Sequence, residues 1–244
     1  VRPTGEAMSI ELGPGILRNI FDGIGRPLKA IKESSGAFIT AGSDVETFDK
    51  HQKWTVRMKL QRDDTVKQGD IYATIDETGI IEHRLMIPKG ISGTVVEIAD
   101  DGDYTLEDTL IKIKDEDGSV HSLTMVQRWP IKTPRPVSKR LDFAMPLVTG
   151  QRVIDTLFPI TKGGAAAIPG GFGSGKTMTQ HQLAKWCDAD LIVFVGCGER
   201  GNEMTQALEE FSELTDPKSG KPLTDRTVLI ANTSNMPVAA REAS

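Results

Sequence analysis

The sequence predicts an α/β fold, an incomplete doubly wound parallel sheet with an inserted all-β module. Apolar runs alternate with amphipathic stretches from residue 149 onward, as strands and helices do around a parallel sheet. A glycine-rich loop at 170–177 lies between an expected strand and an expected helix. Short β-like runs separated by turn residues fill 36–115, with no helical pattern among them. We therefore expect four regions: 1–35, the start of the α/β domain; 36–115, the inserted module; 116–148, a connector; and 149–244, the rest of the α/β domain.

Composition and charge narrow the classes of protein. The chain has 244 residues, enough to bury a sizeable core. It holds 29 Lys and Arg against 34 Asp and Glu, a net charge of −5 that argues against broad binding to nucleic acid or anionic membranes. No apolar run approaches the roughly 20 residues that span a bilayer. Cys187 and Cys197 have no metal-ligand spacing, which favours a reducing compartment. Because Val1 is not an initiator methionine, we expect a piece of a longer protein.

The first 35 residues carry two turn signals around a short apolar cluster. Gly-Pro-Gly at 13–15 and Asp-Gly at 22–23 are turn-forming sequences. Between them four apolar residues recur at helical spacing: Ile16, Leu17, Ile20 and Phe21. We expect a single helical turn here that packs on a core.

Residues 36–115 predict a small β barrel or sandwich. Turn pairs such as Asp-Asp and Asp-Gly separate the strand candidates, which recur about every ten residues. The candidates are WTVRMKL at 54–60, DIYATI at 70–75, HRLMI at 83–87, GTVVEI at 93–98 and TLIKI at 109–113. We interpret the acidic residues between them as solvated turns rather than a metal site: Asp63, Asp64, Asp100, Asp101 and Asp103.

The connector at 116–148 is rich in proline and in basic residues. Five basic side chains lie near Trp129: Arg128, Lys132, Arg135, Lys139 and Arg140. A proline-stiffened connector with solvated charges is the favoured interpretation, and a nucleic-acid patch is the alternative.

Strands and helices alternate in the last region. GAAAI at 164–168, DLIVFV at 190–195 and TVLIA at 227–231 predict buried strands, although alanine is a weak strand former. KTMTQHQLAKWC at 176–187 predicts a helix, and 202–214 places its apolar residues along one helix face. In such a sheet the ligand lies at the carboxyl ends of the strands.

Residues 170–177, GGFGSGKT, fit the phosphate-loop pattern G-x-x-x-x-G-K-[ST] without a mismatch. The glycines allow positive φ and leave backbone N–H groups open to a phosphate. Lys176 can reach the β- and γ-phosphates, and the Thr177 hydroxyl can ligate Mg²⁺. The helix that begins near Lys176 adds the positive end of its dipole. The alternative is a plain glycine turn.

The strand at 190–195 opens into GCGERGNE, which places Glu199 and Arg200 at the edge that carries the phosphate loop. A carboxylate repels a γ-phosphate, but it can accept a hydrogen bond from a water aligned for attack. The Arg200 guanidinium suits a phosphate or Glu199 itself. A surface ion pair is the alternative. The segment also fits the dinucleotide pattern G-x-G-x-x-G, but Glu199 would place negative charge where a pyrophosphate binds, and the next strand ends in Asn232 rather than an acid.

Five long segments resemble the catalytic A subunit of V-type (vacuolar or archaeal-type) rotary ATPases. They are ELGPGILRNIFDGIGRPL at 11–28, LVTGQRVIDTLFPITKGG at 147–164, GGFGSGKT at 170–177, GCGERGNEM at 196–204 and NTSNMPVAAREAS at 232–244. The resemblance covers nearly the whole chain. It implies a P-loop (RecA-like) nucleotide-binding domain, with 36–115 as the extra bulge domain of that subunit.

The resemblance also implies a site for ATP or ADP with Mg²⁺. Six residues would line the phosphates: Gly170, Gly171, Phe172, Gly173, Ser174 and Gly175. Lys176 would hold the β- and γ-phosphates and Thr177 the Mg²⁺. Glu199 matches the family's catalytic glutamate, which orients the attacking water, and Arg200 matches the arginine that contacts the terminal phosphate. Arg241 is left unassigned.

The implied assembly is a ring that alternates this subunit with a non-catalytic B subunit, which supplies an arginine finger in trans. Central and peripheral stalk subunits would couple ATP turnover to H⁺ or Na⁺ pumping at the cytoplasmic face of a membrane, reached only through the complex. The chain lacks the family's amino-terminal barrel, the second acidic strand near Mg²⁺, the adenine pocket and the carboxy-terminal helical domain, which puts activity of this piece alone in question.

Two other classes of function stay open. A ring-shaped nucleic-acid motor on the same core is supported by the basic connector alone, since no direct nucleic-acid contact is otherwise expected. A binding module, with 36–115 as the working part, would leave the phosphate loop without a role.

Overall fold

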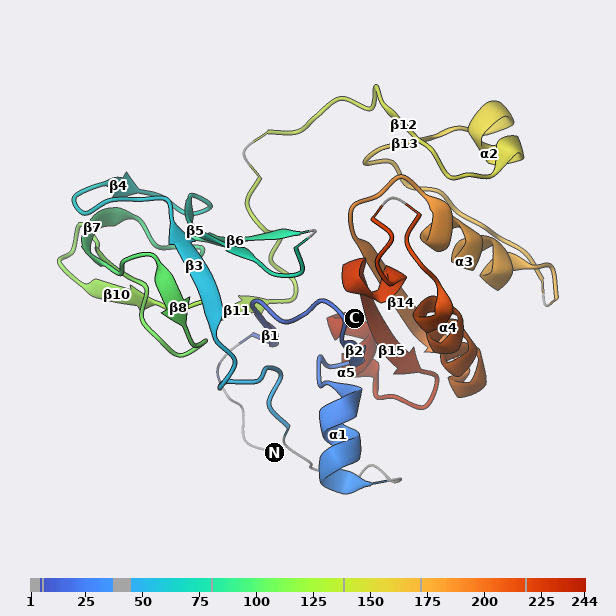
Figure 1. Ribbon diagram of the computed structural model, residues 1–244, viewed down its shortest axis with the longest axis horizontal. Coiled ribbons are helices and arrows are strands. Elements are labelled where there is room, and N and C mark those ends of the chain that lie inside the picture. The colour runs from blue at the N-terminus through green and yellow to red at the C-terminus, as the bar shows by residue number, and fades with distance from the viewer. Residues whose placement is uncertain are drawn as a thin grey trace.

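The computed structural model describes residues 5, 7–36, 45–79, 81–137, 139–171, 173–217 and 219–244. Figure 1 shows two bodies, a β-rich module and an α/β part, joined by the N-terminal segment and by the connector that follows the module. Within these ranges, no helix combines the length and apolar character that crossing a bilayer demands.

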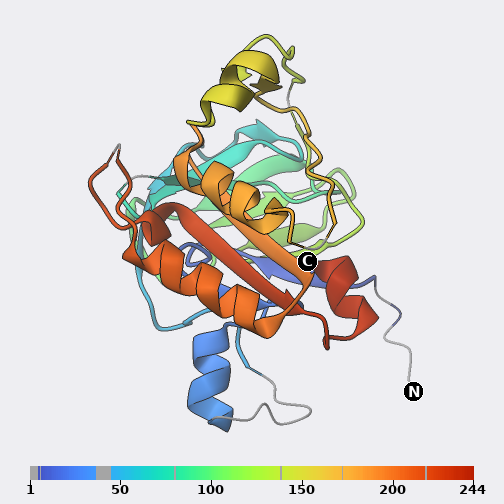
Figure 2. The same cartoon turned by 90° about the vertical axis from the view of Figure 1, so that its right-hand side faces the viewer.

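The α/β part is built on a parallel sheet of three strands in the order β14-β15-β2. These are β14 (Ile192–Glu199), β15 (Thr227–Thr233) and β2 (Ile20–Asp22). Helices α3 (Lys176–Trp186) and α4 (Gly201–Glu213) cover one face of the sheet, the face turned to the viewer in Figure 2. The predicted fold class, an incomplete parallel α/β sheet with an inserted all-β module, is confirmed.

The helix-covered face holds a small aromatic core. Phe194 of β14 and Phe211 of α4 lie with ring centroids 5.6 Å apart, and His181 of α3 meets Phe194 edge-on at 5.2 Å. Ile192 and Leu223 complete the cluster. A side chain at Gly196 would collide with Met204, so glycine there lets α4 lie close against the strand. The apolar face predicted for the helix at 202–214 therefore packs on the core.

The strand expected at 190–195 begins two positions later and runs on to Glu199. Gly196 and Cys197 keep the parallel pairing with Ala231 and Asn232, and the register shifts between Cys197 and Glu199. Gly198, at φ +82°, sits in that irregularity. The apolar run that predicted the strand ends at Val195, whereas pairing with β15 carries the strand on to Glu199.

Two local predictions are wrong. GAAAI at 164–168 is not a strand: the segment is largely exposed, and no described strand pairs with it. Alanine side chains offer little surface to pack on neighbours, which is what stabilises a strand. The expected helical turn at 16–21 is absent, because Ile20 and Phe21 belong to β2 and pair with β15. Leu17 and Phe21 nevertheless lie in a core, packed on Val228. Helix α1 (Leu28–Ser35) follows and was not predicted.

The module consists of two antiparallel four-stranded sheets with a shared apolar core. One sheet has the order β6-β5-β3-β8: β6 (Glu82–Met86), β5 (Ile71–Asp76), β3 (Trp54–Met58) and β8 (Gly102–Tyr104). The other has the order β10-β9-β7-β4: β10 (Val120–Leu123), β9 (Ile111–Lys114), β7 (Gly93–Ile98) and β4 (Thr65–Val66). The five predicted strands are all present: 93–98 coincides with β7, and the other four have shifted ends. Strands β4 and β8 were missed because they are short, and β10 lies past residue 115, where we expected the connector.

The module's core continues past residue 115, where we expected the connector to begin. Leu123 and Met125 belong to the same buried cluster as Val56 and Tyr72. Strand β11 (Gln127–Pro130) then pairs with β1 (Ser9–Leu12). Part of the basic stretch is also structural: the Arg135 guanidinium stacks 4.5 Å above the Trp129 ring.

The segment between the module and the phosphate loop packs loosely. Strand β12 (Pro146–Leu147) pairs with β13 (Ile160–Thr161), and α2 (Arg152–Leu157) buries none of its residues. Several large apolar side chains are therefore exposed: Leu141, Phe143, Met145, Val148, Val153, Leu157 and Phe158. The carboxy-terminal helix α5 (Val238–Ala243) lies at the other side of the sheet, beside β2 and β15 (Figure 2).

Candidate functional site

The phosphate loop leads into α3, as the sequence predicts. Gly173 and Gly175 take positive φ values of +74° and +82°, which only glycine adopts readily, and Gly175 is the residue before α3. Space is open above Gly171, Gly173 and Gly175, where a Cβ would meet nothing within 4 Å. The same atom on Gly170 would collide with the Ser174 hydroxyl. Phe172 lies outside the described residues. The loop thus presents bare backbone at the amino end of a helix.

Lys176 folds back over its own loop. Its ammonium donates hydrogen bonds to the carbonyl oxygens of Gly170 at 2.6 Å and Gly171 at 2.7 Å. The Ser174 hydroxyl donates to the same Gly171 carbonyl at 2.8 Å. These contacts place a positive charge directly above the loop, where phosphate oxygens could replace the two carbonyls as acceptors.

Glu199 stands at the end of β14, next to the loop that follows β15. The Ser234 amide donates to the Glu199 carbonyl oxygen at 2.9 Å, which holds the backbone of Glu199 in place. Its side chain lines a small cavity of about 40 Å³ together with Thr177 of α3 and Glu203 of α4. The sheet therefore brings Thr177, Lys176 and Glu199 to the same edge.

The electrostatics of Glu199 differ from those of a surface carboxylate. Burial raises the pKa of the Glu199 carboxyl, and so do a hydrogen bond with Glu203 and the negative charge of that neighbour. The Lys176 charge acts in the opposite direction but does not cancel the rise. A carboxylate with a raised pKa is a better proton acceptor than an ordinary one.

Sequence reasoning missed Glu203 and His181. Glu203 lies four residues after Glu199 in the first turn of α4, where an acid usually complements the helix dipole, so its type alone carried no signal. His181 lies one helical turn after Thr177 and is almost fully buried, near the Glu210 carboxylate. Burial lowers the pKa of His181. Both residues line the cavity beside Glu199.

Two arginines stand near this edge without touching Glu199 in the described residues. Arg200 directly precedes α4 and is exposed. Arg241, on α5, donates weakly to the Ser234 carbonyl at 3.4 Å. The suggestion that Arg200 holds Glu199 therefore finds no contact within the described part of the chain, whereas an exposed guanidinium remains suited to a ligand phosphate.

The described residues fit a magnesium nucleotide better than a resident metal. Within those ranges, no group of three or more His, Cys, Asp or Glu is arranged to hold an ion. Mg²⁺ typically takes one or two protein ligands and fills its other positions with water and substrate phosphates. The Thr177 hydroxyl, with two carboxylates across a small cavity, matches that requirement.

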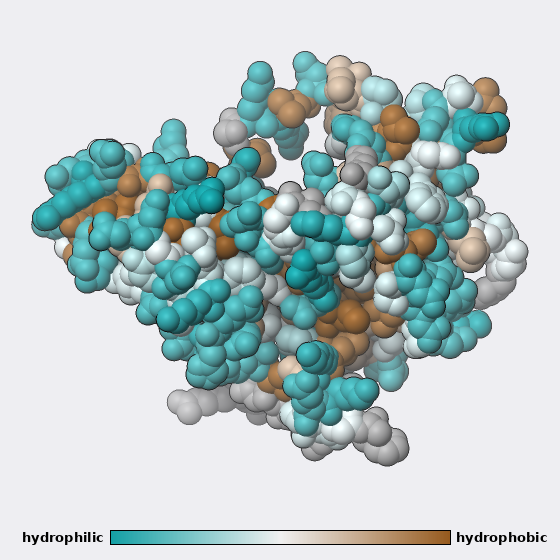
Figure 3. Space-filling view, viewed as in Figure 1, coloured by the Kyte–Doolittle hydropathy of each residue, from teal (hydrophilic) through white to brown (hydrophobic). Residues whose placement is uncertain are grey.

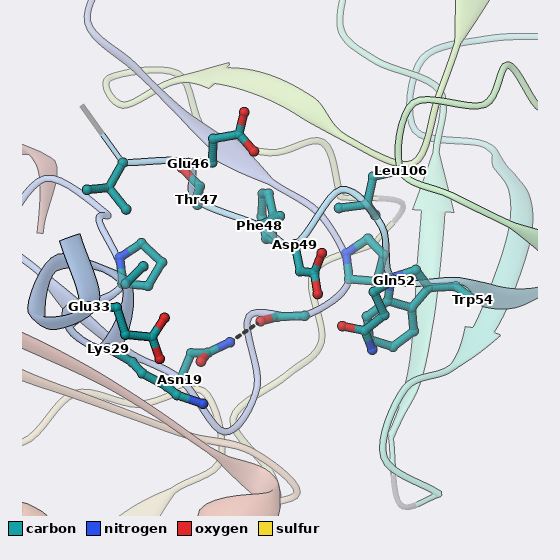
Figure 4. A pocket seen from close by; sticks show the side chains of 15 residues that line it. Asn19, Lys29, Glu33, Glu46, Thr47, Phe48, Asp49, Gln52, Trp54 and Leu106 are labelled. Atoms are coloured by element: carbon teal, nitrogen blue, oxygen red, sulfur yellow. Dashed lines mark hydrogen bonds between the residues drawn. The ribbon is translucent and has the colours of Figure 1, made fainter.

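Larger hollows occur far from the loop. One of about 510 Å³ lies between α1 and the module, lined by apolar Phe48, Trp54 and Leu106 and by polar Asp49 and Gln52 (Figure 4). A smaller apolar recess of about 120 Å³ lies where β2, β15 and the carboxy terminus meet, and its brown surface is visible in Figure 3. Neither contains a residue of the phosphate-loop site.

Comparison with known proteins gives matches along the chain. The ATP synthase alpha/beta subunit barrel-sandwich domain matches residues 45–132, and the nucleotide-binding domain of the ATP synthase alpha/beta family matches 150–244. The chain is 58% identical over 243 residues to the A subunit of the A-type ATP synthase from Methanopyrus kandleri. It is 57% identical over 241 residues to the V-type ATP synthase alpha chain of Halothermothrix orenii.

These matches take in 100% and 99% of this chain but 41% of each relative, so the chain spans about two fifths of their length. A solved ATPase from the type III secretion system of pathogenic bacteria aligns over 97% of this chain and 41% of its own, at 19% identity and a TM-score of 0.46. That likeness is too low to support an argument. Sequence identity along the whole chain, with both domain matches in order, establishes that the chain belongs to the ATP synthase alpha/beta family.

Proposed function

We propose that this chain carries the catalytic ATP site of the A (alpha) subunit of an A-type or V-type ATP synthase, and that it hydrolyses or makes ATP as part of the whole subunit. The observation that carries the proposal is the convergence of Lys176, Thr177 and Glu199 at one edge of a parallel sheet. The family membership and the names of the relatives support the same function.

In the proposed mechanism each residue has one task. Lys176 exchanges the Gly170 and Gly171 carbonyls for β- and γ-phosphate oxygens, and the loop amides with the amino end of α3 hold the phosphate charge. Thr177 would hold the Mg²⁺ that accompanies the nucleotide, and that ion would supply positive charge to offset the charge developing on the transferred phosphoryl group. Glu199 accepts a hydrogen bond from the attacking water and orients it in line. Arg200 contacts the terminal phosphate.

The proposed setting is a rotary complex. The subunit would alternate with a non-catalytic B subunit in a hexamer, receive an arginine finger from it, and act on central and peripheral stalk subunits at the cytoplasmic face of a membrane. The runner-up, a nucleic-acid motor, is less well supported because part of the basic connector has partners within the chain. Arg135 stacks on Trp129, and Lys132 pairs with Glu242 at 3.4 Å.

The test uses the complete subunit in its assembled complex. Lys176→Ala should abolish ATP turnover and weaken nucleotide binding. Glu199→Gln should retain nucleotide binding and lower turnover by about 10²–10⁴-fold, the usual loss when a general base is removed. Glu209→Gln, an exposed carboxylate on the same helix as Glu203, is the matched control and should leave turnover unchanged. Turnover at the wild-type rate in Glu199→Gln would refute the role given to Glu199.

A further inference from the structure

The hairpin formed by β5 and β6 links the module to the α/β part, and in Figure 1 it points toward that part. Ile81, in its turn, packs on Leu17, Phe21 and Val228 of the other body. The Lys221 ammonium donates to the Thr78 carbonyl at 3.3 Å. The turn therefore meets the sheet from the side of the strands' amino ends, opposite the phosphate loop.

Within this turn, Asp76 and Glu77 differ in what they bind. Asp76 serves its own hairpin, since its carboxylate accepts from the Gly79 amide at 2.8 Å. Glu77 instead reaches a segment some sixty positions earlier: its Oε1 accepts from the Gly15 amide at 2.7 Å and the Leu17 amide at 3.4 Å. Its other oxygen meets His83 Nδ1 at 3.1 Å. The Glu77 side chain is only 4% exposed, so these partners replace nearly all of its water.

The segment that Glu77 holds leads directly into the sheet. Gly15 is fixed from both sides, because its carbonyl accepts from the Asn19 side chain at 2.6 Å. The Arg18 amide donates to the Thr227 carbonyl at 3.2 Å, and the Arg18 guanidinium pairs with Asp225 at 2.8 Å. Strand β2 begins at Ile20 and pairs with β15. A hydrogen bond to the Gly15 amide therefore fixes the segment that leads into β2, the strand at the edge of the sheet.

We propose that Glu77 is an interdomain latch, whose carboxylate fixes residues 15–17 and thereby locks the orientation of the module relative to strands β2 and β15. With the latch closed, the module moves as one body with the edge of the sheet. With the latch open, the module is still held by the chain connections, the β1–β11 pair, the Ile81 contact and the Lys221–Thr78 hydrogen bond. The proposal is independent of the assignment of Glu199.

The first test measures amide hydrogen exchange in the full chain. In Glu77→Ala the Gly15 and Leu17 amides should exchange about 10- to 100-fold faster, as expected when a hydrogen bond to a charged group is lost. Glu82→Gln is the matched control, because Glu82 lies on the same hairpin, is half exposed and pairs only with Arg84 among the described residues. Unchanged exchange at Gly15 and Leu17 in Glu77→Ala would overturn the proposal.

Folding is monitored in the same experiment through the amides of the module core, such as Val56 and Ile113, which should stay protected. Where Glu77→Ala fails to fold, Glu77→Gln replaces it. Its amide oxygen keeps an acceptor but loses the charge, so an increase smaller than in the alanine variant is expected. Exchange at Gly15 equal to that of the wild type in a folded Glu77→Gln variant would overturn the proposal in that case.

The second test measures orientation directly. Spin labels at Val120→Cys in the module and Glu209→Cys on α4, both exposed, report the distance between the bodies once Cys187 and Cys197 are replaced by Ala. With Glu77 present the distance distribution should be narrow, and in Glu77→Ala it should broaden. A distribution that stays narrow while Gly15 exchange rises would mean that the carboxylate holds the segment but not the module, which overturns the claim about orientation.

Discussion

The two bodies of the molecule bury different kinds of side chain. The module has one continuous apolar core that includes Val56, Tyr72, Ile87, Val95 and Ile113. The α/β part has two small clusters, one around Phe211 and one around Leu17. Among the described residues that are almost fully buried along backbone and side chain, the charged ones lie in the α/β part: Asp22, Lys185, Asp216, Asp225 and Arg226. The module's Glu77 also buries its side chain, but against the backbone of residues 15–17 outside the module.

This difference separates stability from function. Burial of apolar side chains stabilises the fold without requiring partners in a fixed geometry, which suits a rigid domain. Buried charges are stable only while each keeps its partner, so they respond to movement of neighbouring elements. Of these groups, Lys185 lies on α3, Asp22 on β2, and Asp225 and Arg226 directly before β15. The apolar burial of the α/β part is also incomplete, since Val193 on β14 is 63% exposed.

The largest effect should come from the module core. Ile113→Ala removes a fully buried side chain, and we expect it to lower the free energy of unfolding of the module by about 2–5 kcal/mol. Val120→Ala in the neighbouring strand β10, where the side chain is 55% exposed, is the control and should change it by less than about 0.5 kcal/mol. Urea denaturation followed by tryptophan fluorescence measures both. A loss of under about 1 kcal/mol for Ile113→Ala would show that the module lacks a tight core.

A smaller effect is expected from the buried charges of the α/β part. The Lys185 ammonium pairs with Glu210 at 2.5 Å, and His181 lies 3.6 Å from the same carboxylate. Lys185→Met leaves Glu210 without its main partner, and we expect a loss of about 1–3 kcal/mol, reduced from the fully buried case because Glu210 is partly exposed.

The matched variant for that pair is the double substitution Lys185→Met with Glu210→Leu. Because it removes both charges, it should recover much of the loss in a double-mutant cycle measured by denaturation. A double variant no more stable than Lys185→Met alone would contradict the charge-pair explanation and point to lost packing instead.

Local pattern predicted most of the fold and failed where a distant partner sets the structure. Five of the eight described module strands and helices α3 and α4 follow from periodicity and turn residues. Strand β2 could not be predicted from its spacing, because Ile20 and Phe21 pair with β15, some two hundred positions later. GAAAI at 164–168 has the position of a strand but lacks a described neighbour to pair with.

The candidate site divides in the same way. The phosphate-loop pattern identified Lys176 and Thr177, and the strand end identified Glu199. Their approach to one another follows from the rule that parallel strands bring their carboxyl ends together. Sequence reasoning did not single out Glu203 because an acidic residue in the first turn of a helix is common. Sequence reasoning did not identify Glu77 because Gly15 and Leu17 bind it through their backbone amides, and the identity of these residues does not reveal such contacts.

Acidification should open the latch between the two bodies. Burial alone would raise the pKa of Glu77, but hydrogen bonds from His83 and the Gly15 amide outweigh it and lower the pKa below 4.5. A carboxyl with a pKa lower in the folded than in the unfolded state adds stability above the unfolded pKa and loses it as the pH falls through the folded value. We expect Gly15 protection, corrected for intrinsic exchange, to fall below about pH 4.5, and to show no such step in Glu77→Gln. Gly15 protection that does not fall on acidification of the wild type would contradict this.

A last contrast in stability is expected between two neighbouring valines on one face of the sheet. Val193 and Val228 lie opposite each other in the β14–β15 register, but Val228 is 7% exposed under Leu17 and Phe21, whereas Val193 is open. Threonine keeps the shape of valine but has a hydroxyl in place of one methyl group, which costs about 1–3 kcal/mol where it is buried without a partner. Val228→Thr should therefore destabilise the α/β part by about 1–3 kcal/mol in urea denaturation, and Val193→Thr by less than about 0.5 kcal/mol. An equal loss at both positions would mean that the face of β14 is covered in solution, and the contrast between a sealed module and an open sheet would then disappear.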